Sequence, residues 1–532
     1  MNSAFFEFNV AVSGMLTAKS ALANISHNIS NAATPGYSRQ VAKVKAGIPL
    51  YASNGRGMVG TGSDYYGVGQ IRDTYIDKKY WSYTCTNGEY SVKRSQLCLL
   101  ETIFNDLSDT GLTGCMTDFF NEMSELTFSA GDSSYASGVI DTTVNLVENI
   151  NSYAANMIKQ QQDVNDEIYS LVETINSLGN QISILNKEIF SYEIQGQAAN
   201  DLRDQRALLV DELSGYVNVE VKEEHGANYE ENNADLRYKV LLNGQEFIDH
   251  FFYNPLTCVM REELADPDDA PHLYNVYCMN GSRFNEEGMS GELKGLLDIR
   301  DGDGGITDGT GNSYKGIPYY MDRMNLFVRT LAMALNDGTN YISGEKIENI
   351  TAHREGYNMN GETNGLFLSY KDDLGNITDT ETIDYEKMTA MNFSVAKKLL
   401  ESPENLAIAK LSDTEKATLA AGGNVDFSSN NEVILGFMKL KDSYDLFAEG
   451  NIYDFIVATD SALAIDNKQA TNFKEYYTDI ITTVDNQRIQ VSGVSLNEEM
   501  TNLIKYQQVY QASARIMNTM NQLYDRLINE VG

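Results

Sequence analysis

The chain has 532 residues, of which 42% are hydrophobic and 22% are charged, so it can build packed cores and is not a wholly disordered protein. Its formal net charge of −35 argues against a protein that binds nucleic acid or anionic lipid, because both kinds of surface need basic side chains. The length predicts about three or four domains. No apolar run approaches the roughly 20 residues of a membrane-spanning helix.

The charge is unevenly distributed along the chain. Residues 1–45 carry a net charge of +3 and residues 494–532 a net charge of −1, so the segment between them carries −37. Ends of low net charge can pack closely against copies of themselves, whereas an acidic middle is typical of a solvated outer surface that resists aggregation. We therefore expect contacts between copies to involve the two ends.

The N-terminal segment predicts a helix. Apolar residues recur along it at helical spacing and form one stripe, which contains Phe8, Val12, Met15, Leu22, Ile25 and Ile29. The sequence Thr34-Pro35-Gly36 predicts that this helix ends near Asn31, because proline and glycine break helices. An extended segment over residues 41–50 and a glycine-rich loop region follow.

The clearest periodicity lies between residues 161 and 190. Two rows of apolar residues alternate there at heptad spacing: Val164, Leu171, Leu178 and Leu185 in one row, and Ile168, Ile175, Ile182 and Ile189 in the other. This pattern predicts a coiled-coil seam on a helix that begins near Gly138 and exceeds about 50 residues. We expect the seam to be an intramolecular core, because a shorter helix predicted at 200–213 and later helices can cover it.

The character of the sequence changes after residue 215. Val217, Val219 and Val221 alternate with polar residues, and a second alternating run ends in the turn Asn243-Gly244, which predicts strands joined by hairpins. Further helices are predicted over residues 320–335, 394–411, 432–446 and 471–490.

The C-terminal segment predicts another long amphipathic helix. Apolar and aromatic residues recur there at intervals of seven: Leu496, Leu503, Tyr510, Met517 and Tyr524. Other apolar residues widen this face beyond what one partner helix can cover, and such a helix would be marginally stable alone. Both ends of the chain therefore need partners, and the obvious candidates are each other and the same ends of neighbouring copies.

These elements predict a multidomain α + β protein with a coiled-coil inner domain formed by long terminal helices. The predicted domains are a terminal helical polymerisation domain (1–55 with 491–532), a helical-bundle domain with the long heptad helix (56–215 with 315–345 and 392–490), a β-rich outer domain (216–305) and a small loop-rich or β insertion (346–391).

The sequence contains no recognisable catalytic or cofactor motif. Residues 55–60 match GxGxxG, but the residues after them do not predict the helix that a nucleotide site needs. The acidic loop that begins at Asp301 has Asn312 where a calcium loop requires a carboxylate. The histidines and cysteines lack the spacings of zinc ligands. We therefore expect no enzyme, no cofactor and no bound metal.

Both chain ends carry a resemblance to a known family. Residues 25–40 (ISHNISNAATPGYSRQ) and residues 493–515 (GVSLNEEMTNLIKYQQVYQASAR) resemble the paired signatures of bacterial flagellar rod, hook and hook-associated proteins. Residues 199–206 (ANDLRDQR) and 290–301 (SGELKGLLDIRD) resemble the hook-associated proteins of the hook–filament junction. Ala33 departs from the family, which commonly has asparagine at that place.

The resemblance implies a structural subunit of the bacterial flagellum that polymerises at the hook–filament junction, as a mechanical adaptor between hook and filament. Such proteins are exported by the flagellar type III pathway without a cleaved signal peptide, which implies a secreted, extracellular location. The partners it implies are copies of the chain itself, the hook protein, a second hook–filament junction protein and, before secretion, a dedicated export chaperone. It implies no binding of nucleic acid or membrane.

The resemblance also assigns roles to the terminal residues. We expect the N-terminal stripe to pack against the C-terminal row of Leu496, Leu503, Tyr510, Met517 and Tyr524, both within a copy and between copies. Pro35, Gly36 and Tyr37 should end the first helix, with Tyr37 anchoring the turn. The C-terminal helix is the expected chaperone-binding segment, because its apolar face must be kept from self-association before export.

Three other hypotheses are compatible with parts of the sequence. The chain could be another flagellar axial protein, such as a hook, distal rod or second junction protein. It could be a secreted adhesin-like surface protein whose acidic middle is the functional part. It could also carry an inserted enzyme domain, although the poorly matched stretch at residues 345–390 is short for one.

Overall fold

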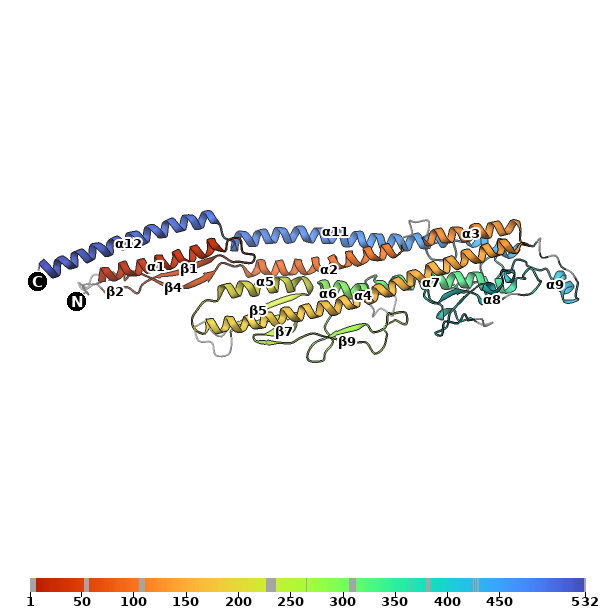
Figure 1. The fold of residues 1–532 in the computed structure, drawn as a ribbon, viewed down its shortest axis with the longest axis horizontal. Coiled ribbons are helices and arrows are strands. Elements are labelled where there is room, and N and C mark those ends of the chain that lie inside the picture. The colour runs from red at the N-terminus through yellow and green to blue at the C-terminus, as the bar shows by residue number, and fades with distance from the viewer. Residues whose placement is uncertain are drawn as a thin grey trace.

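Long helices run along the length of an elongated body, and both ends of the chain lie at one tip (Figure 1). The computed structural model describes residues 6–51, 57–104, 111–225, 236–264, 266–305, 312–363, 365–378, 383–423, 425, 427 and 430–530. At the tip, helix α1 (Phe6–Ser30) lies beside helix α12 (Leu496–Glu530) and a ribbon formed by β1 (Gln40–Ala46) and β4 (Ser63–Gln70).

The other elements form the body and its outer parts. The helices are α2 (Thr74–Phe104), α3 (Leu112–Phe128), α4 (Ser133–Glu193), α5 (Asn200–Tyr216), α6 (Glu292–Asp301), α7 (Ile317–Asp337), α8 (Lys397–Glu401), α9 (Asp413–Ala420), α10 (Glu432–Leu440) and α11 (Ile452–Ser492). Short 3-10 turns are η1 (His353–Glu355), η2 (Tyr385–Lys387) and η3 (Pro403–Asn405). The remaining strands are β2 (Leu50–Tyr51), β3 (Met58–Val59), β5 (Val219–His225), β6 (Leu236–Leu242), β7 (Gln245–Asp249), β8 (Phe252–Tyr253), β9 (Thr257–Met260), β10 (Tyr274–Tyr277), β11 (Leu368–Tyr370) and β12 (Phe393–Val395).

Helix α4 contains the heptad rows and has 61 residues, or about 92 Å of length. The Asp132 side chain caps its N-terminus by accepting a hydrogen bond from the Ser134 backbone N–H at 2.8 Å. The helix packs against α3, α5, α6, α7 and short strands of the body. The predicted long helix is therefore confirmed, and it begins slightly before Gly138.

Helices α2 and α11 pair along the body and are joined by aromatic side chains. The ring centroid of Tyr90 lies 4.8 Å from that of Phe473 and 6.1 Å from that of Tyr477. Asn451 and Asp454 form a capping box at the start of α11. Helix α11 has 41 residues and starts well before the predicted helix at 471–490.

The β-rich range predicted at 216–305 holds two separate sheets. Strands β5, β6, β7 and β8 form a four-stranded antiparallel sheet, while β9 pairs only with β10. Asn243 and Gly244 connect β6 to β7 with φ angles of 45° and 80°, the left-handed turn that this dipeptide favours. Residues 292–301, near the end of the predicted range, form helix α6, which packs on α2; the domain boundary itself stays a prediction.

A predicted helix also differs from the structure. The predicted helix at 394–411 is wrong: β12 lies at its start and pairs with β11, and only α8 and η3 are helical within it. Pro403 explains part of this, because it cannot continue the helix of α8. Strand β4, which lies beyond the predicted end of the terminal unit at residue 55, pairs with β1 and contacts α1; the extent of that unit stays a prediction.

Within the described residues, no helix combines the length and apolarity needed to cross a membrane. The five cysteines, all of which are described, form no disulfide bond.

An acidic pocket lies where the loop before β10 meets α7. It is lined by Asp266, Asp268, Asp269 and Asp322, together with Gln161 of α4. Burial, and then the charges of Asp266 and Asp268, raise the pKa of Asp322 to about 6, although Arg329 opposes this shift.

This raised pKa predicts a pH-dependent stability. An unfolded Asp titrates near about 4, so the folded state binds the proton more tightly and its stability falls as the pH rises from about 4 to about 6. At pH 7 we expect Asp322→Asn to raise the free energy of unfolding by about 1 kcal/mol, a value reduced for partial solvent exposure. Below about pH 4 the variant and the natural chain should be equally stable. Denaturant unfolding at both pH values tests this, with the exposed Asp373→Asn as control, and an equal effect at both pH values would contradict it.

Candidate functional site at the junction of the chain ends

The two terminal helices approach each other through small side chains. The buried residues Ala11, Ala18 and Ala21 of α1 lie at heptad spacing with Gly14. A Cβ atom on Gly14 would lie only 3.2 Å from Ser513 Oγ of α12, so the two helices approach each other closely at this point. Small residues permit this distance, because the separation of packed helices depends on the side chains at the contact.

Most of the predicted packing residues do not lie at the centre of the contact between α1 and α12. On α1, only Ile25 of the predicted stripe is buried, whereas Phe8, Val12, Met15, Leu22 and Ile29 are half-buried. On α12, Leu503, Met517 and Tyr524 are half-buried, whereas Leu496 and Tyr510 are exposed. The large apolar residues therefore flank the contact instead of forming its centre, and their role in packing between copies stays a prediction.

The turn after α1 is held by Tyr37 as a hydrogen-bond donor. Its hydroxyl donates to Asn28 Oδ1 at 2.8 Å, and its ring meets that of His27 edge-on at 5.6 Å. Burial, together with the nearby carboxylates of Asp201 and other residues, raises the pKa of this hydroxyl, so it stays protonated and donating.

Pro35 and Gly36 complete this turn. Pro35 is exposed, and Gly36 adopts a φ of +72°, the left-handed conformation that favours glycine. A side chain on Gly36 would also collide with Leu208 of α5. The turn therefore ends α1 and brings the following strand against α5.

A buried polar network then connects the two chain ends. Asn28 is central to it: its amide donates to the Gln40 carbonyl at 2.8 Å and to Glu499 Oε2 at 3.2 Å, and its carbonyl accepts the Gln40 N–H at 3.0 Å. Arg39 Nε donates to Glu499 Oε1 at 2.8 Å. Glu499 is 2% exposed, so these two partners compensate the burial of its charge.

Helix α5 joins the same network through the segment 199–206. Asp204 Oδ2 accepts the Ser38 N–H at 2.9 Å, and Asp201 Oδ1 accepts from Gln40 Nε2 at 2.7 Å. Burial raises the pKa of Asp204, against the opposing effects of Ser38 and Arg72. We name the set Asn28, Arg39, Gln40, Glu499, Asp201 and Asp204 the terminal junction.

A row of ion pairs continues from the terminal junction into the body. Arg72 Nε lies 2.6 Å from Asp77 Oδ2, and Arg488 of α11 pairs with both Asp77 and Asp211. Trp81 Nε1 donates to Asp211 at 2.6 Å. Because these residues come from α2, α5 and α11, the pairs fix the tip to three helices of the body.

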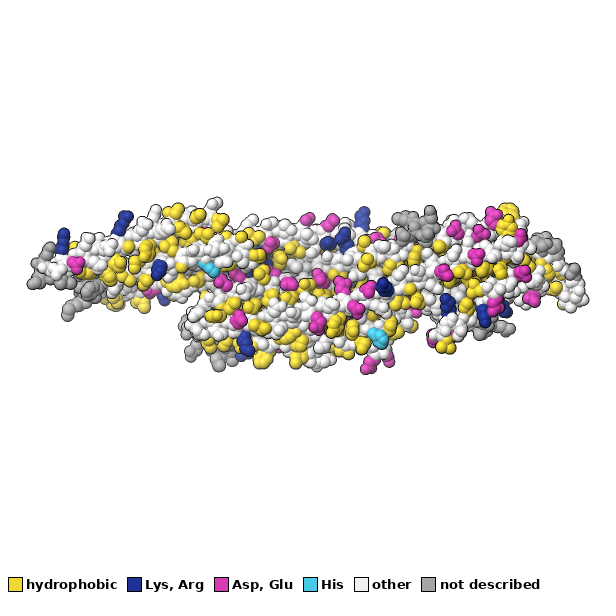
Figure 2. Space-filling view, in the orientation of Figure 1, with side chains coloured by type: hydrophobic (Ala, Val, Ile, Leu, Met, Phe, Trp, Pro, Cys, Tyr) yellow, Lys and Arg dark blue, Asp and Glu magenta, His cyan; other side chains and the backbone are white. Residues whose placement is uncertain are grey.

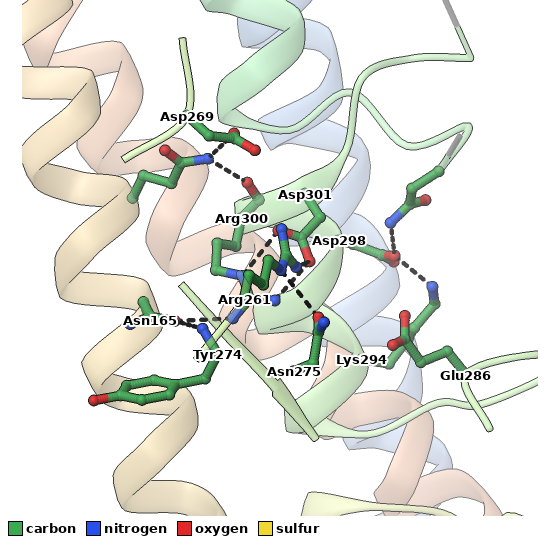
Figure 3. Close-up of polar contacts among 12 residues, drawn as sticks. Asn165, Arg261, Asp269, Tyr274, Asn275, Glu286, Lys294, Asp298, Arg300 and Asp301 are labelled. Carbon is green, nitrogen blue, oxygen red and sulfur yellow. Dashed lines mark hydrogen bonds and ion pairs between the residues drawn. The ribbon is translucent and has the colours of Figure 1, made fainter. Parts of the chain in front are cut away.

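Helix α6, the segment 292–301, forms a second polar centre within the body (Figure 3). Arg300, which is fully buried, donates to Asp301 at 2.9 and 2.7 Å and to Asn165 of α4 at 3.0 Å. Arg261, which follows β9, donates to the same Asp301 at 2.6 Å. The two arginines lower the pKa of Asp301 against the effect of burial, so the predicted acidic loop starts with a paired, charged carboxylate.

The same helix is tied to α2 at its other side. Asp298 lies 2.6 Å from both Lys93 of α2 and Lys294, as Figure 3 shows for Lys294. A Cβ atom on Gly295 would lie 2.7 Å from the Glu89 carbonyl oxygen, so only glycine allows α6 this close to α2. The segment 290–301 therefore acts as a structural connector of the body and the β-rich part.

The heptad residues of α4 lie inside the body. Leu185 is half-buried. The other seven are buried: Val164, Ile168, Leu171, Ile175, Leu178, Ile182 and Ile189. Their surroundings include sheet residues as well as helices, since Phe247 of β7 and Tyr253 of β8 lie against Gly179. Their role as a coiled coil within the chain stays a prediction.

The polar members of the terminal junction are not among the site residues that the sequence predicts. Asn28 and Glu499 carried a signal that could have identified them, because each is a polar residue at a heptad position on the inner face of an amphipathic helix. Their partners carried none, since Arg39 and Glu499 are separated by 460 positions. Among the described residues, no group of His, Cys, Asp and Glu side chains is arranged to hold a metal ion.

The terminal junction predicts unequal roles for two adjacent glutamates. Glu499→Gln should lower the free energy of local opening at the tip by about 2 kcal/mol, because the buried Arg39 contact loses its counter-charge. Glu498→Gln is the matched control: its side chain is 61% exposed, and it should cost less than about 1 kcal/mol although it also pairs with Arg39. Cleavage rates by proteinase K at residues 31–38 and 492–495 measure the opening, and equal rates for the two variants would contradict this assignment.

Known proteins resemble the chain over nearly its whole length. Residues 97–368 match the family described as "Flagellar hook-associated protein FlgK helical domain", and residues 485–530 match "Flagellar basal body rod FlgEFG protein C-terminal". The chain is 26% identical to "Flagellar hook-associated protein 1" of Bacillus subtilis (strain 168), covering 100% of this chain and 99% of that protein. It is 24% identical to the protein of the same name from Escherichia coli (strain K12), covering 98% of this chain and 99% of that protein.

A solved structure has the same fold. The flagellar hook junction protein FlgK from Burkholderia pseudomallei superposes with a TM-score of 0.58 at 13% sequence identity, covering 78% of this chain and 100% of that one. This likeness supports the multidomain α + β fold predicted from the sequence.

Proposed function

The chain belongs to the flagellar hook-associated protein FlgK family, and from this membership we infer that it is a structural subunit of the bacterial flagellum. It polymerises at the hook–filament junction, where it acts as an adaptor between hook and filament. Its partners are copies of itself and the hook proteins next to it. The family is a structural one, and we propose no catalytic activity for the chain.

The observation that carries this function is the convergence of three distant segments at the tip. The segments 25–40, 199–206 and 493–515 meet in the terminal junction, where Asn28, Asp204 and Glu499 are buried. The network fixes α1 and α12 relative to the body, while the large apolar residues beside their contact remain half-buried or exposed. A tip whose helices are held in register but keep uncovered apolar surface suits a subunit that completes its packing beside other copies.

The proposal also includes the export route, the location outside the cell and one further binding partner. The chain leaves the cell by the flagellar type III pathway without a cleaved signal peptide and works outside the cell. There it contacts a second hook–filament junction protein. Support comes from the family membership and from the low net charge of the ends, which permits close contacts between copies.

A strain that lacks the gene tests this function. It should keep its hooks and release flagellin into the medium without filaments, and the natural chain should restore them. The variant Met517→Asp should not, because it places a charge on the half-buried side of α12 that faces α1. Asn518→Asp adds the same charge at an exposed neighbouring position and should restore filaments in nearly all cells. Filaments restored equally by both variants would contradict the packing role.

We place the chaperone-binding segment on α12. Its apolar residues on the outside of the tip include Leu496, Met500 and Ile504, each more than half exposed. An exported subunit must keep such a surface from self-association before it leaves the cell. An export chaperone should capture the full chain at least about tenfold better than a chain without residues 490–532. Undiminished capture of the shortened chain would show that the chaperone binds elsewhere.

A further inference from the structure

The region between α7 and α10 lies at the end of the body away from the chain ends, and its described residues form only short elements (Figure 1). The longest of them, α9, has 8 residues. Buried backbone N–H and C=O groups need hydrogen-bond partners, and short elements supply few of them. Buried polar side chains take this role here, and they join segments that lie far apart in the sequence.

Asn336, near the end of α7, shows how such a side chain connects two segments. It is fully buried, and its amide donates to the Leu368 carbonyl at 2.8 Å. Its own carbonyl accepts the N–H groups of Phe367 and Leu368 at 2.7 and 3.0 Å. The side chain thus binds the backbone at the start of β11 to α7. An amide does not titrate, so this connection does not depend on pH.

His353 of η1 makes the same kind of connection with an ionisable ring. The residue is 1% exposed, its Nδ1 lies 2.8 Å from the Gly365 carbonyl oxygen, and its Nε2 lies 3.1 Å from the Ala407 backbone nitrogen. Because the Ala407 N–H can only donate, Nε2 accepts it and Nδ1 carries the ring proton that Gly365 accepts. We name this arrangement of His353, Gly365 and Ala407 the His353 staple.

Other contacts close the space around the His353 staple. The Tyr357 N–H donates to the Ala409 carbonyl at 2.9 Å. A Cβ atom on Gly356 would lie 2.8 Å from Ala407 Cβ and 2.9 Å from Val433 Cγ2 of α10. On the face shown in Figure 2, histidine side chains are visible near the tip and over the β-rich part, but not over the end that holds the staple. The ring therefore cannot reach water or a new partner unless the segments around it separate.

The charged side chains on the surrounding elements have other partners or are exposed. On η1, Arg354 pairs with Asp337 of α7 at 3.3 Å. Its neighbour Glu355 pairs with Lys346 at 3.2 Å. Further charged residues on the segments packed around the staple are all exposed: Glu362, Lys398, Glu404, Lys410, Glu432 and Lys439. No carboxylate among the described residues therefore compensates a positive charge on the buried ring.

Protonation of Nε2 is incompatible with the His353 staple. The added proton would face the Ala407 N–H, leave that N–H without its acceptor and bury an uncompensated charge. Burial therefore lowers the pKa of His353 to about 4, against the opposing effect of its hydrogen bond to Gly365, whereas a histidine in water titrates near about 6.5. The opened segment binds the proton more tightly, so opening is favoured as the pH falls from about 6.5 to about 4.

We propose that the His353 staple is an acid-sensitive latch, which holds residues 405–409 against η1 at neutral pH and releases them when the surroundings become acidic. The hydrogen bond to Gly365 survives protonation, because Nδ1–H still donates, so the segment released is the one that contains Ala407. The tip lies at the other end of the molecule (Figure 1), so this property is independent of the proposed assembly of the tip.

Hydrogen–deuterium exchange of the full chain at pH 7 and pH 5 measures the release. After correction for intrinsic exchange rates, the opening constant of amides at residues 405–409 should be about twentyfold larger at pH 5, the factor that the two pKa values give. His353→Asn removes the titrating group and should make this constant nearly equal at the two pH values. The control His272→Asn, at an exposed histidine whose φ of 66° suits asparagine, should keep the twentyfold difference. A natural chain without the difference, or a His353→Asn chain that retains it, would overturn the proposal.

A second measurement needs no variant of His353. In the natural chain labelled with nitrogen-15 histidine, NMR should show a ring with a protonated Nδ1 and a bare Nε2. This ring should keep that form at about pH 5.5, where a histidine in water already carries its second proton. If all five histidine rings are doubly protonated at that pH, the proposal is wrong.

Discussion

A buried carboxylate at the start of α12 is the constraint on which the arrangement of the chain ends depends. Glu499 is almost inaccessible to solvent, and a charge in that position is tolerated only when donors surround it. Asn28 and Arg39 supply those donors from the other end of the chain, and Asn28 also binds the strand that follows its own helix. The two chain ends must therefore meet in one register, which apolar packing alone specifies weakly.

Once this register is set, the apolar surface of the tip divides into two parts. The inner part is narrow and made of small residues such as Ala18 and Ala21, which let α1 and α12 approach closely. The outer part consists of large residues that one chain cannot cover, among them Leu496 and Ile516. In such a subunit the terminal helices already have their register, but part of their apolar surface is exposed to solvent. Contacts with other copies bury that surface on assembly. The acidic body limits the other ways in which copies can meet.

Much of the fold was predictable, because the apolar residues of a long amphipathic helix recur at helical spacing in the sequence. The heptad repeats in α4 and α12 predicted two long helices that the structure contains. The sequence Thr34-Pro35-Gly36 predicted the end of α1. Helix α2 was not predicted as an element, because its exposed and tyrosine-rich faces carry no clear apolar period. Most of the large residues of the predicted stripe on α1 are half-buried beside the contact with α12, because close approach of two helices requires small residues; the role of the stripe in packing stays a prediction. The junction could not be predicted, because its partners become neighbours only when segments far apart in the chain fold together.

The central claim is that the tip holds its register through the junction but lacks burial until copies assemble. Hydrogen–deuterium exchange of the purified monomer tests it most directly. Amides of α12 beyond residue 505 should exchange at least about a hundredfold faster than those at the centre of α4, and assembly into flagella should slow them to the rate of α4. If α12 in the dilute monomer is already protected as strongly as α4, its burial is complete without neighbours, and the account is wrong.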